Sequence, residues 1–250
     1  MDTYDKCPKK YHYRYIEKVE IEQKTWSHTE FGSCAHKILE LFHQRILDGE
    51  SDPEGYSILM KRCFVDAVKE FNIEVLEETT WSPQGEKPGV KYLREIMQDY
   101  LDGIRKDGLP PVVGIEEPFS FNLDEHTLVR GFIDRVDFVE PGVYRVVDYK
   151  TSKDGKYLSG FQLLVYAEAL RRKYPDLKKV LGSYMLLKHK CKTIDFEFSL
   201  DDIRNCETKM IKKASSIKIE DVWVKKPTPL CGFCDYKSIC QDAVWVQEEE

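Results

Sequence analysis

The chain has 250 residues, a mass of 29.3 kDa and 42% hydrophobic residues, which suffices for the core of a folded domain and excludes disorder as the main state. Its 38 basic and 44 acidic residues give a net charge of −6, which argues against a protein that coats polyanions through general positive charge. No apolar stretch could span a membrane, and the first residues lack the apolar core of a signal peptide, so we expect a cytoplasmic protein.

Charge is distributed unevenly along the chain. Residues 15–144 carry 14 basic and 26 acidic side chains, a balance of −12, whereas residues 145–190 carry 11 and 4, a balance of +7. We therefore expect an anionic partner to meet the second half of the chain.

Hydrophobic spacing predicts helices in the first half, and strands alternating with helices in the second. In chain order we expect helices over 31–46, 56–78 and 88–106 with loops at 49–55 and 81–89, strands over 112–123, 128–139 and 143–150, a helix over 157–173, strands over 180–188 and 193–198, and a helix from Asp201. This order predicts an α/β fold with a mixed central sheet flanked by helices, in which residues 45–110 form a helical insertion.

Asp134 and Asp148 lie inside otherwise apolar strands, where an unpartnered carboxylate is costly, and this placement suggests a metal site. Strand alternation puts Lys150 on the same face as Asp148. A three-residue loop at 140–142 would place Asp134 opposite Asp148, with Cβ atoms about 5 Å apart. A two-residue loop would instead place Asp134 opposite Tyr149, on the wrong face. The prediction depends on this loop length.

Two carboxylates and a lysine on one face could hold Mg²⁺ or Mn²⁺, which polarises a phosphodiester, while Lys150 orients a water molecule or stabilises the developing charge. A purely structural alternative is a salt bridge between Asp148 and Lys150 at a strand end, with Asp134 paired to Arg135 or Arg130. Spacing alone leaves both alternatives open.

Four motifs in a fixed order carry a resemblance to a known family. They are Gly32-Ser33-Cys34-Ala35-His36-Lys37-x-Leu39-Glu40, Gly131-x-Ile133-Asp134-Arg135-x-Asp137, Asp148-Tyr149-Lys150-Thr151 and Gln162-x-x-x-Tyr166. Together they resemble the RecB-type branch of the PD-(D/E)XK nuclease superfamily. The resemblance implies a restriction-endonuclease-like core over the whole chain.

The resemblance also implies the roles of individual residues. It assigns His36, Asp134, Asp148 and the Tyr149 carbonyl to a metal site and makes Lys150 catalytic, together with Asp134 and Asp148. By the same analogy Gln162 lies beside the site, where it contacts DNA or positions the lysine, with Tyr166 one helical turn away.

Three further positions near these motifs need separate interpretations. Asp137 lies on the opposite strand face from Asp134, so we expect it to pair with an arginine. Glu116 or Glu117 resembles an acidic position common in the family, and either could support the site or be a strand-edge charge. His43, two turns after His36, gains no support from the motifs.

The eight cysteines include one short cluster, C-x2-C-x5-C. In a reducing compartment such spacing suggests a metal, zinc by default, but three thiolates need a fourth ligand. With Cys7 followed by Pro8, the set resembles the iron–sulfur subset of AddB-type helicase-nucleases and CRISPR-adaptation exonucleases. The resemblance implies a [4Fe-4S] cluster that ties the segment 227–250 to the N-terminus and makes 1–250 one domain, with the ligands Cys7, Cys231, Cys234 and Cys240.

For DNA contacts we expect Gln162, Tyr166 and two lysines of the basic region, Lys153 and Lys156. Tyr174, nearby, could stack on a base, whereas residues 171–173 fit a solvated helix face.

The sequence predicts a metal-dependent DNA nuclease. We expect it to act as an exonuclease on single-stranded DNA ends in recombination, repair or phage DNA metabolism, with a helicase or recombination protein as partner, in the cytoplasm of a bacterial, archaeal or phage-infected cell. The alternative is a non-catalytic DNA-binding module stabilised by an iron–sulfur or zinc site.

Overall fold

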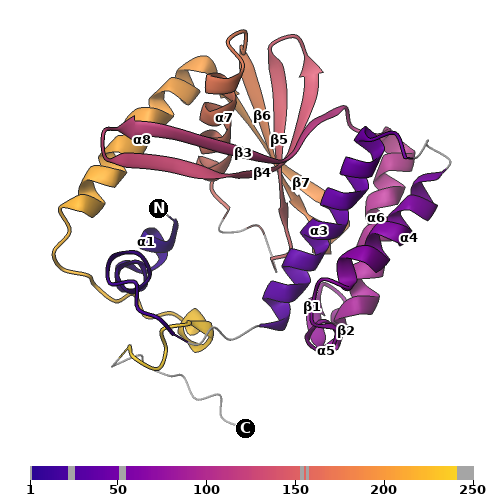
Figure 1. Cartoon of the computed structure of the whole chain (residues 1–250), viewed down its shortest axis with the longest axis horizontal. Helices are drawn as coiled ribbons and strands as arrows, with labels where there is room; N and C mark the ends of the chain where they lie inside the picture. Colours follow the sequence, from indigo (N-terminus) through magenta and orange to yellow (C-terminus); the bar gives the residue numbers. More distant parts are fainter. Residues whose placement is uncertain (1, 22–25, 51–54, 153–154, 156–157, 241–250) are drawn as a thin grey trace. The chain divides into compact units, whose positions relative to one another are not determined.

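The computed structural model describes residues 2–21, 26–50, 55–152, 155 and 158–240, and it divides into two compact units, 25–208 and 1–24 with 209–250. Figure 1 labels the main elements. In chain order they are α1 (Asp2–Lys6), α2 (Pro8–Tyr11), the π-helix η1 (His12–Ile16), α3 (Ser27–Leu47), α4 (Tyr56–Val68), α5 (Ile73–Glu77), β1 (Thr79–Ser82), β2 (Gly85–Pro88), α6 (Gly89–Asp107), β3 (Val112–Asp124), β4 (Thr127–Glu140), β5 (Val143–Lys150), α7 (Phe161–Lys173), β6 (Lys179–Leu186), the 3-10 turn η3 (Leu187–His189), β7 (Lys192–Ser199), α8 (Leu200–Lys218) and the 3-10 turn η4 (Pro229–Phe233).

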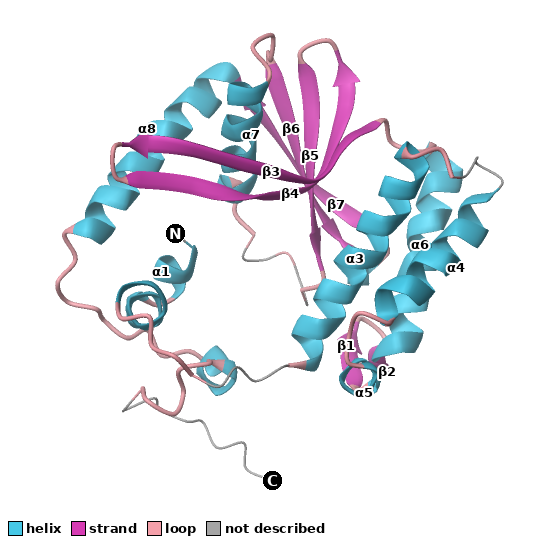
Figure 2. Ribbon diagram, in the orientation of Figure 1, coloured by secondary structure: helices cyan, strands magenta, loops and turns pink. Residues whose placement is uncertain are grey.

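A five-stranded sheet forms the centre of the larger unit, with the order β3-β4-β5-β6-β7. β5 and β6 pair in parallel, and the other neighbouring strands pair antiparallel. Parallel neighbours need a crossover connection, and α7 supplies it. Figure 2 shows helices on both sides of this sheet. The predicted α/β fold with a mixed central sheet is confirmed.

The main hydrophobic core lies between α3, α4 and α6 and one face of the sheet. Val147, Tyr149 and Leu187 are its contributions from the sheet side. Of the apolar residues that predicted the first helix, Ile46 is partly buried, and the other five are fully or almost fully buried in this core: Phe31, Ala35, Ile38, Leu39 and Phe42. Helical periodicity therefore identified the buried face of α3 correctly.

The insertion differs from its prediction in two places. The expected helix over 56–78 is interrupted, because α4 ends at Val68 and Asn72 starts α5 by accepting hydrogen bonds from the backbone of Glu74 and Val75. The expected loop over 81–89 contains the second strand of a small hairpin, β1–β2. An asparagine side chain that caps a new helix competes with continuation of the old one.

The turn between β4 and β5 is the shorter of the two alternatives that the sequence left open. Glu140 pairs with Val143, so Pro141 and Gly142 form a two-residue turn. A bulge between Phe138 and Glu140 then shifts the register by one residue, and Arg135 faces Val147. The register expected from a three-residue loop is thus reached by a two-residue turn plus a bulge. The same register puts Asp134 level with Asp148, one position beyond Arg135–Val147, which is the last pair between the two strands.

The smaller unit joins both ends of the described chain. The ring of Trp223 stacks on His12, with 4.7 Å between ring centroids. Lys10 forms an ion pair with Asp235 at 3.2 Å. Ring stacking and an ion pair thus connect the N-terminal helices to the C-terminal segment. In the part of the chain that the structure describes, no helix is both long and apolar enough to cross a membrane.

Two glycines of α6 provide a matched test of how this helix packs in the larger unit. A Cβ atom on Gly89 would lie 2.1 Å from the carbonyl oxygen of Leu76, whereas a Cβ atom on Gly103 would meet no heavy atom within 4 Å. We expect Gly89→Ala to lower the free energy of unfolding by about 2 kcal/mol or more. Gly103→Ala should raise it by about 0.5–1 kcal/mol, because alanine favours a helix. Urea unfolding measures both, and equal effects would contradict this packing.

Candidate active site

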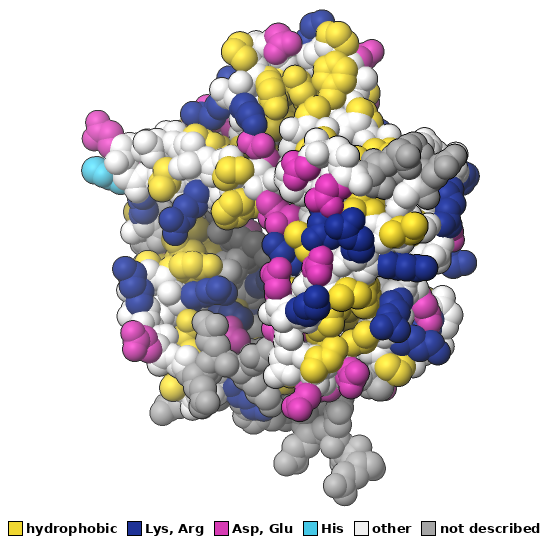
Figure 3. All heavy atoms as spheres, turned by 45° about the vertical axis from the view of Figure 1, so that its right-hand side comes forward, with side chains coloured by type: hydrophobic (Ala, Val, Ile, Leu, Met, Phe, Trp, Pro, Cys, Tyr) yellow, Lys and Arg dark blue, Asp and Glu magenta, His cyan; other side chains and the backbone are white. Residues whose placement is uncertain are grey.

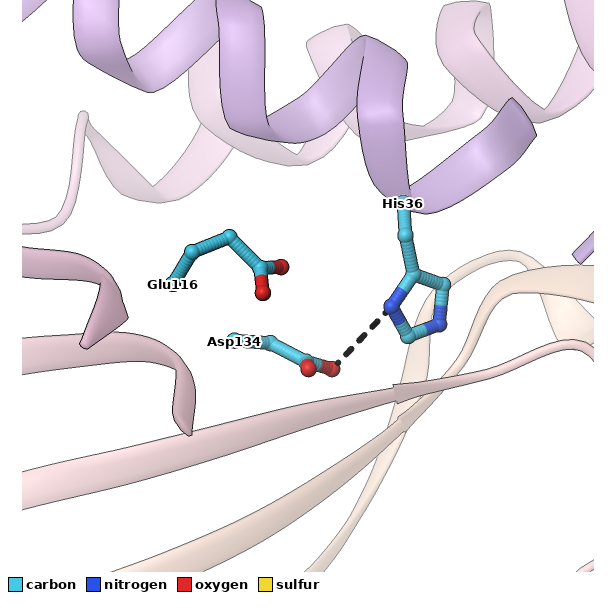
Figure 4. A group of neighbouring side chains, drawn as sticks. All are labelled: His36, Glu116 and Asp134. Carbon is cyan, nitrogen blue, oxygen red and sulfur yellow. Dashed lines mark ion pairs between the residues drawn. The ribbon is translucent and has the colours of Figure 1, made fainter. Parts of the chain in front are cut away.

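Three donor side chains from three elements meet beside the point where β4 and β5 separate. His36 comes from α3, Glu116 from β3 and Asp134 from β4, and their donor atoms lie within 4.8 Å of one another. Figure 4 shows the two carboxylates turned toward the imidazole of His36. We call these three residues the metal-site group. It contains two of the predicted metal ligands, His36 and Asp134, together with Glu116.

The backbone of Tyr149 connects two members of this group. His36 Nε2 donates to the Tyr149 carbonyl oxygen at 3.0 Å, while His36 Nδ1 lies 3.4 Å from Asp134 Oδ2. The amide of Tyr149 donates to Asp134 Oδ2 at 2.7 Å. A glycine in α3 allows this approach, since a Cβ on Gly32 would lie 2.9 Å from the Thr151 hydroxyl at the end of β5.

Asp148 lies in an adjacent group with three of the other predicted residues. It forms an ion pair with Lys150 and accepts hydrogen bonds from Gln162 Nε2 at 2.8 Å and from the Tyr166 hydroxyl at 3.2 Å. Gln162 Oε1 in turn accepts from Lys150 Nζ at 3.3 Å. We call these four residues the Asp148 cluster. The salt bridge of the structural alternative is therefore present, but inside a cluster that also includes Gln162 and Tyr166.

The other half of that alternative is wrong. Arg135 pairs with Asp137 at 2.9 Å and not with Asp134, which faces His36. The expectation that Asp137 pairs with an arginine is confirmed. Both side chains of this pair are almost completely buried.

Glu116 holds its position with a strained backbone. Its φ angle is +43°, in the left-handed region that side chains other than glycine rarely adopt. On either side of it Ile115 faces Arg135 and Glu117 faces Ile133, so Glu116 lies level with Asp134. Strain of this kind is typical of functional sites, where it fixes a side chain in a required place. Glu117, the other candidate, pairs instead with Lys173.

The electrostatics of these residues fit a divalent cation. Burial and the charges of Asp134 and Glu40 raise the pKa of Glu116. Burial also raises the pKa of Asp148; Lys150 opposes the shift and Asp134 adds to it. For His36, burial acts against protonation, but the hydrogen bond to Asp134 and the nearby carboxylates raise the pKa overall. A cation held by carboxylate oxygens and an imidazole would offset this excess of negative charge, and oxygen donors suit Mg²⁺ and Mn²⁺.

A buried polar network supports Tyr149 from behind. Arg135 donates to the hydroxyls of Tyr100 and Tyr149 at 2.6 and 3.0 Å, and His43 Nε2 lies 2.5 Å from the Tyr100 hydroxyl. Burial, aided by the charge of Arg135, keeps the pKa of His43 well below its usual value. His43 thus belongs to this network. Through Tyr149 the network reaches the backbone that contacts His36 and Asp134.

The predicted DNA contacts have different outcomes. Lys153 and Lys156 lie outside the described residues. Residues 171 and 172 form ion pairs with the buried Glu168, in line with a structural helix face. The ring of Tyr174 stacks on Tyr144 with 4.3 Å between centroids, so one face of this ring is already occupied.

The four cysteines of the predicted cluster all belong to the smaller unit. Cys7 Sγ accepts a hydrogen bond from the amide of Lys10, and Cys231 Sγ one from the amide of Thr228, both at 3.4 Å. All four thiols are partly exposed, unlike the buried Cys34. Among the described residues these sulfur atoms are not gathered as closely as the donors of the metal-site group.

With this geometry established, comparison with known proteins identifies the class. A family model described as the PD-(D/E)XK nuclease superfamily matches residues 1–241. The chain therefore belongs to the PD-(D/E)XK nuclease superfamily, and the resemblance noted in the sequence is confirmed at that level.

The relatives include AddB-type subunits of the ATP-dependent helicase/deoxyribonuclease from two streptococci. The Streptococcus mutans protein is 38% identical over 109 residues, covering 40% of this chain and 10% of that protein. The Streptococcus uberis protein is 28% identical over 193 residues, covering 74% of this chain and 17% of that protein. The chain thus spans only a small part of these relatives. A solved structure of a candidate exonuclease from Eubacterium rectale is 14% identical, with a TM-score of 0.44 over 91% of this chain and 85% of that one.

Glu116 allows a direct test of the strain at the site. Glu116→Gly and Glu116→Ala both remove the carboxylate, but only glycine adopts a φ of +43° without cost. We expect the glycine variant to be more stable by about 1 kcal/mol in urea unfolding with a metal chelator present. Glu117 does not have a positive φ angle, so there the alanine variant should be more stable than the glycine variant. If the glycine variant were the more stable one at both positions, the backbone at Glu116 would not be strained.

Proposed function

We propose that the chain is a Mg²⁺- or Mn²⁺-dependent deoxyribonuclease that hydrolyses phosphodiester bonds at single-stranded DNA ends. The observation that carries the proposal is the proximity of the metal-site group to the Asp148 cluster where β4 and β5 separate. The charge of Asp134 contributes to the raised pKa of Asp148, which shows that the two groups are close.

Each side chain has a role in this proposal. A divalent ion would polarise the phosphodiester and lower the pKa of a bound water. His36, Asp134 and Asp148, with the Tyr149 carbonyl, would hold that ion, and Glu116 would add a carboxylate. Lys150 stabilises negative charge on the phosphate or orients the water. Gln162, bonded to both Lys150 and Asp148, keeps the two in place and lies where DNA would contact it, beside Tyr166.

The substrate and the biological setting are also part of the proposal. The streptococcal relatives are subunits of helicase/deoxyribonucleases, which supports DNA as the substrate and a helicase or recombination protein as the partner, in the cytoplasm. The basic residues Lys153 and Lys156 would contact the strand.

We also propose that the four cysteines bind a [4Fe-4S] cluster. Hydrogen bonds from backbone amides to Cys7 and Cys231 support this, because such bonds stabilise ligating thiolates. The rings of Tyr13 and Tyr236, 5.4 Å apart, and the Lys10–Asp235 ion pair already hold the two segments together. The cluster would then fix both ends of one nuclease domain, 1–250.

The catalytic assignment predicts large losses of cleavage for two single variants. Lys150→Ala and Asp148→Ala should each lower the rate of DNA cleavage about 10²-fold or more, because each removes a group that acts on the reacting phosphate. A matched control is Lys179→Ala, which removes a partly exposed lysine of β6 that is paired with Glu197 of β7.

The assay measures label released from 5′- and 3′-labelled, single- and double-stranded DNA with Mg²⁺ or Mn²⁺. Wild-type cleavage by Lys150→Ala would show that the site is misassigned. DNA binding without cleavage by the wild type would identify a non-catalytic DNA-binding module.

The cysteine assignment predicts about four iron atoms per chain after anaerobic purification. Cys7→Ser and Cys231→Ser should lose most of the iron, whereas Cys191→Ser, a partly exposed cysteine outside the set, should keep it. Metal analysis and visible absorbance measure this outcome. Stoichiometric zinc without iron would contradict the cluster.

A further inference from the structure

The hairpin of β3 and β4, here called the β3–β4 ribbon, has one covered side. Phe119 contacts Tyr166 of α7 with 5.8 Å between ring centroids, and Arg172 of α7 lies 4.4 Å from the ring of Phe121. A Cβ on Gly131 would lie 2.8 Å from Phe119, so this glycine makes room for the ring. The side of the ribbon that carries Phe119, Phe121 and Gly131 is therefore packed toward α7.

The alternate residues of the same ribbon are open to solvent. Phe132 is 60% exposed and Leu128 is 56% exposed, values that are high for large apolar side chains. Pro118 faces Phe132, and Ser120 faces Arg130, in the strand register. We call this set the outer stripe, and all of its members are exposed: Pro118, Ser120, Leu128, Arg130 and Phe132.

The outer stripe continues directly from the metal-site group. Phe132 is two residues before Asp134 on β4 and therefore projects from the same side of the strand, about 7 Å away along it. Arg130 lies one further step of the same length away. The order along this side is a metal ligand, an exposed aromatic ring, an exposed guanidinium and an exposed leucine.

The chemistry of the outer stripe favours one kind of occupant. It is narrow and places one aromatic ring, Phe132, next to one cationic side chain, Arg130, on the same strand. A stable protein interface needs instead a broad surface with a closely packed centre. On the face drawn in Figure 3, exposed hydrophobic side chains lie in small groups among charged ones. Aromatic rings that stack on bases, with basic residues for phosphates, are typical of single-stranded nucleic acid sites.

We propose that the outer stripe binds the single strand that enters the active site, with Phe132 stacked on a base next to the scissile phosphate and Arg130 on the adjoining phosphate. This inference rests on the proposed nuclease function for its substrate. It assigns strand binding to β4, not to the basic side chains at 171–173, which are engaged by Glu168 and Glu117.

Fluorescence anisotropy with a labelled oligothymidine and no divalent ion tests the stripe separately from cleavage. In the full-length chain, Phe132→Ala should raise the Kd about tenfold and Phe132→Trp should restore it, with its fluorescence quenched by the bound strand. Arg130→Ala should raise the Kd and lower the slope of log Kd against log salt concentration by about one.

Two control variants match these substitutions. Phe138→Ala removes an exposed phenylalanine of β4 that lies four residues beyond Asp134 along the strand, away from Phe132. Arg62→Ala removes an exposed arginine of α4. Both should bind the oligonucleotide like the wild type, and thermal melts should show that every variant is folded.

The results separate the two proposals. If the wild type cleaves DNA but Phe132→Ala and Arg130→Ala bind it normally, the outer stripe is not the strand site and the nuclease function stands. If the wild type cleaves no DNA with any divalent ion but Phe132→Ala weakens binding, the stripe stands and the nuclease function fails. Equal weakening by Phe138→Ala would also overturn the stripe.

Discussion

The site depends on the point at which β4 and β5 stop pairing. Beyond the Arg135–Val147 pair, the backbone of Tyr149 contacts side chains instead of the backbone of β4, while β5 continues to pair with β6. The amide of Tyr149 donates to Asp134, and its carbonyl accepts from His36. Buried backbone groups need such partners, so the separation of the strands and the assembly of the site are one structural event.

The helical insertion contributes to the site through the side chain of Tyr149. The Tyr149 side chain is buried in a network with Arg135 and with Tyr100 of α6, and His43 of α3 completes it. Buried polar groups that satisfy one another fix a single arrangement, because losing one partner leaves the others unpaired at a cost of about 1–3 kcal/mol. The insertion thus acts as a support for the strand that carries Asp148 and Lys150.

Sequence alone predicted the sheet, the main helices and the neighbourhood of Asp134 and Asp148, because alternation and helical periodicity report burial directly. It could not predict how the register between β4 and β5 is reached. A two-residue turn with a bulge and a three-residue loop give the same pairing at Arg135, so the sequence pattern does not distinguish them. It also could not choose Glu116 over Glu117: the decisive property is a backbone φ angle of +43°, which no residue type specifies here.

Asn72, which splits the expected helix, carried a recognisable capping signal. The exposure of Phe132 depends on which side of the ribbon α7 covers, and that is a tertiary property.

The central claim is that His36, Glu116 and Asp134 form a divalent-cation site at the separation of β4 and β5. The most direct measurement is an anomalous difference map from crystals of the full chain grown with Mn²⁺, recorded beside a crystal of Asp134→Asn. We expect a strong peak between the imidazole and the carboxylates of the wild type, and its loss in the variant. A wild-type map without a peak there, in a crystal that binds Mn²⁺ elsewhere, would contradict it.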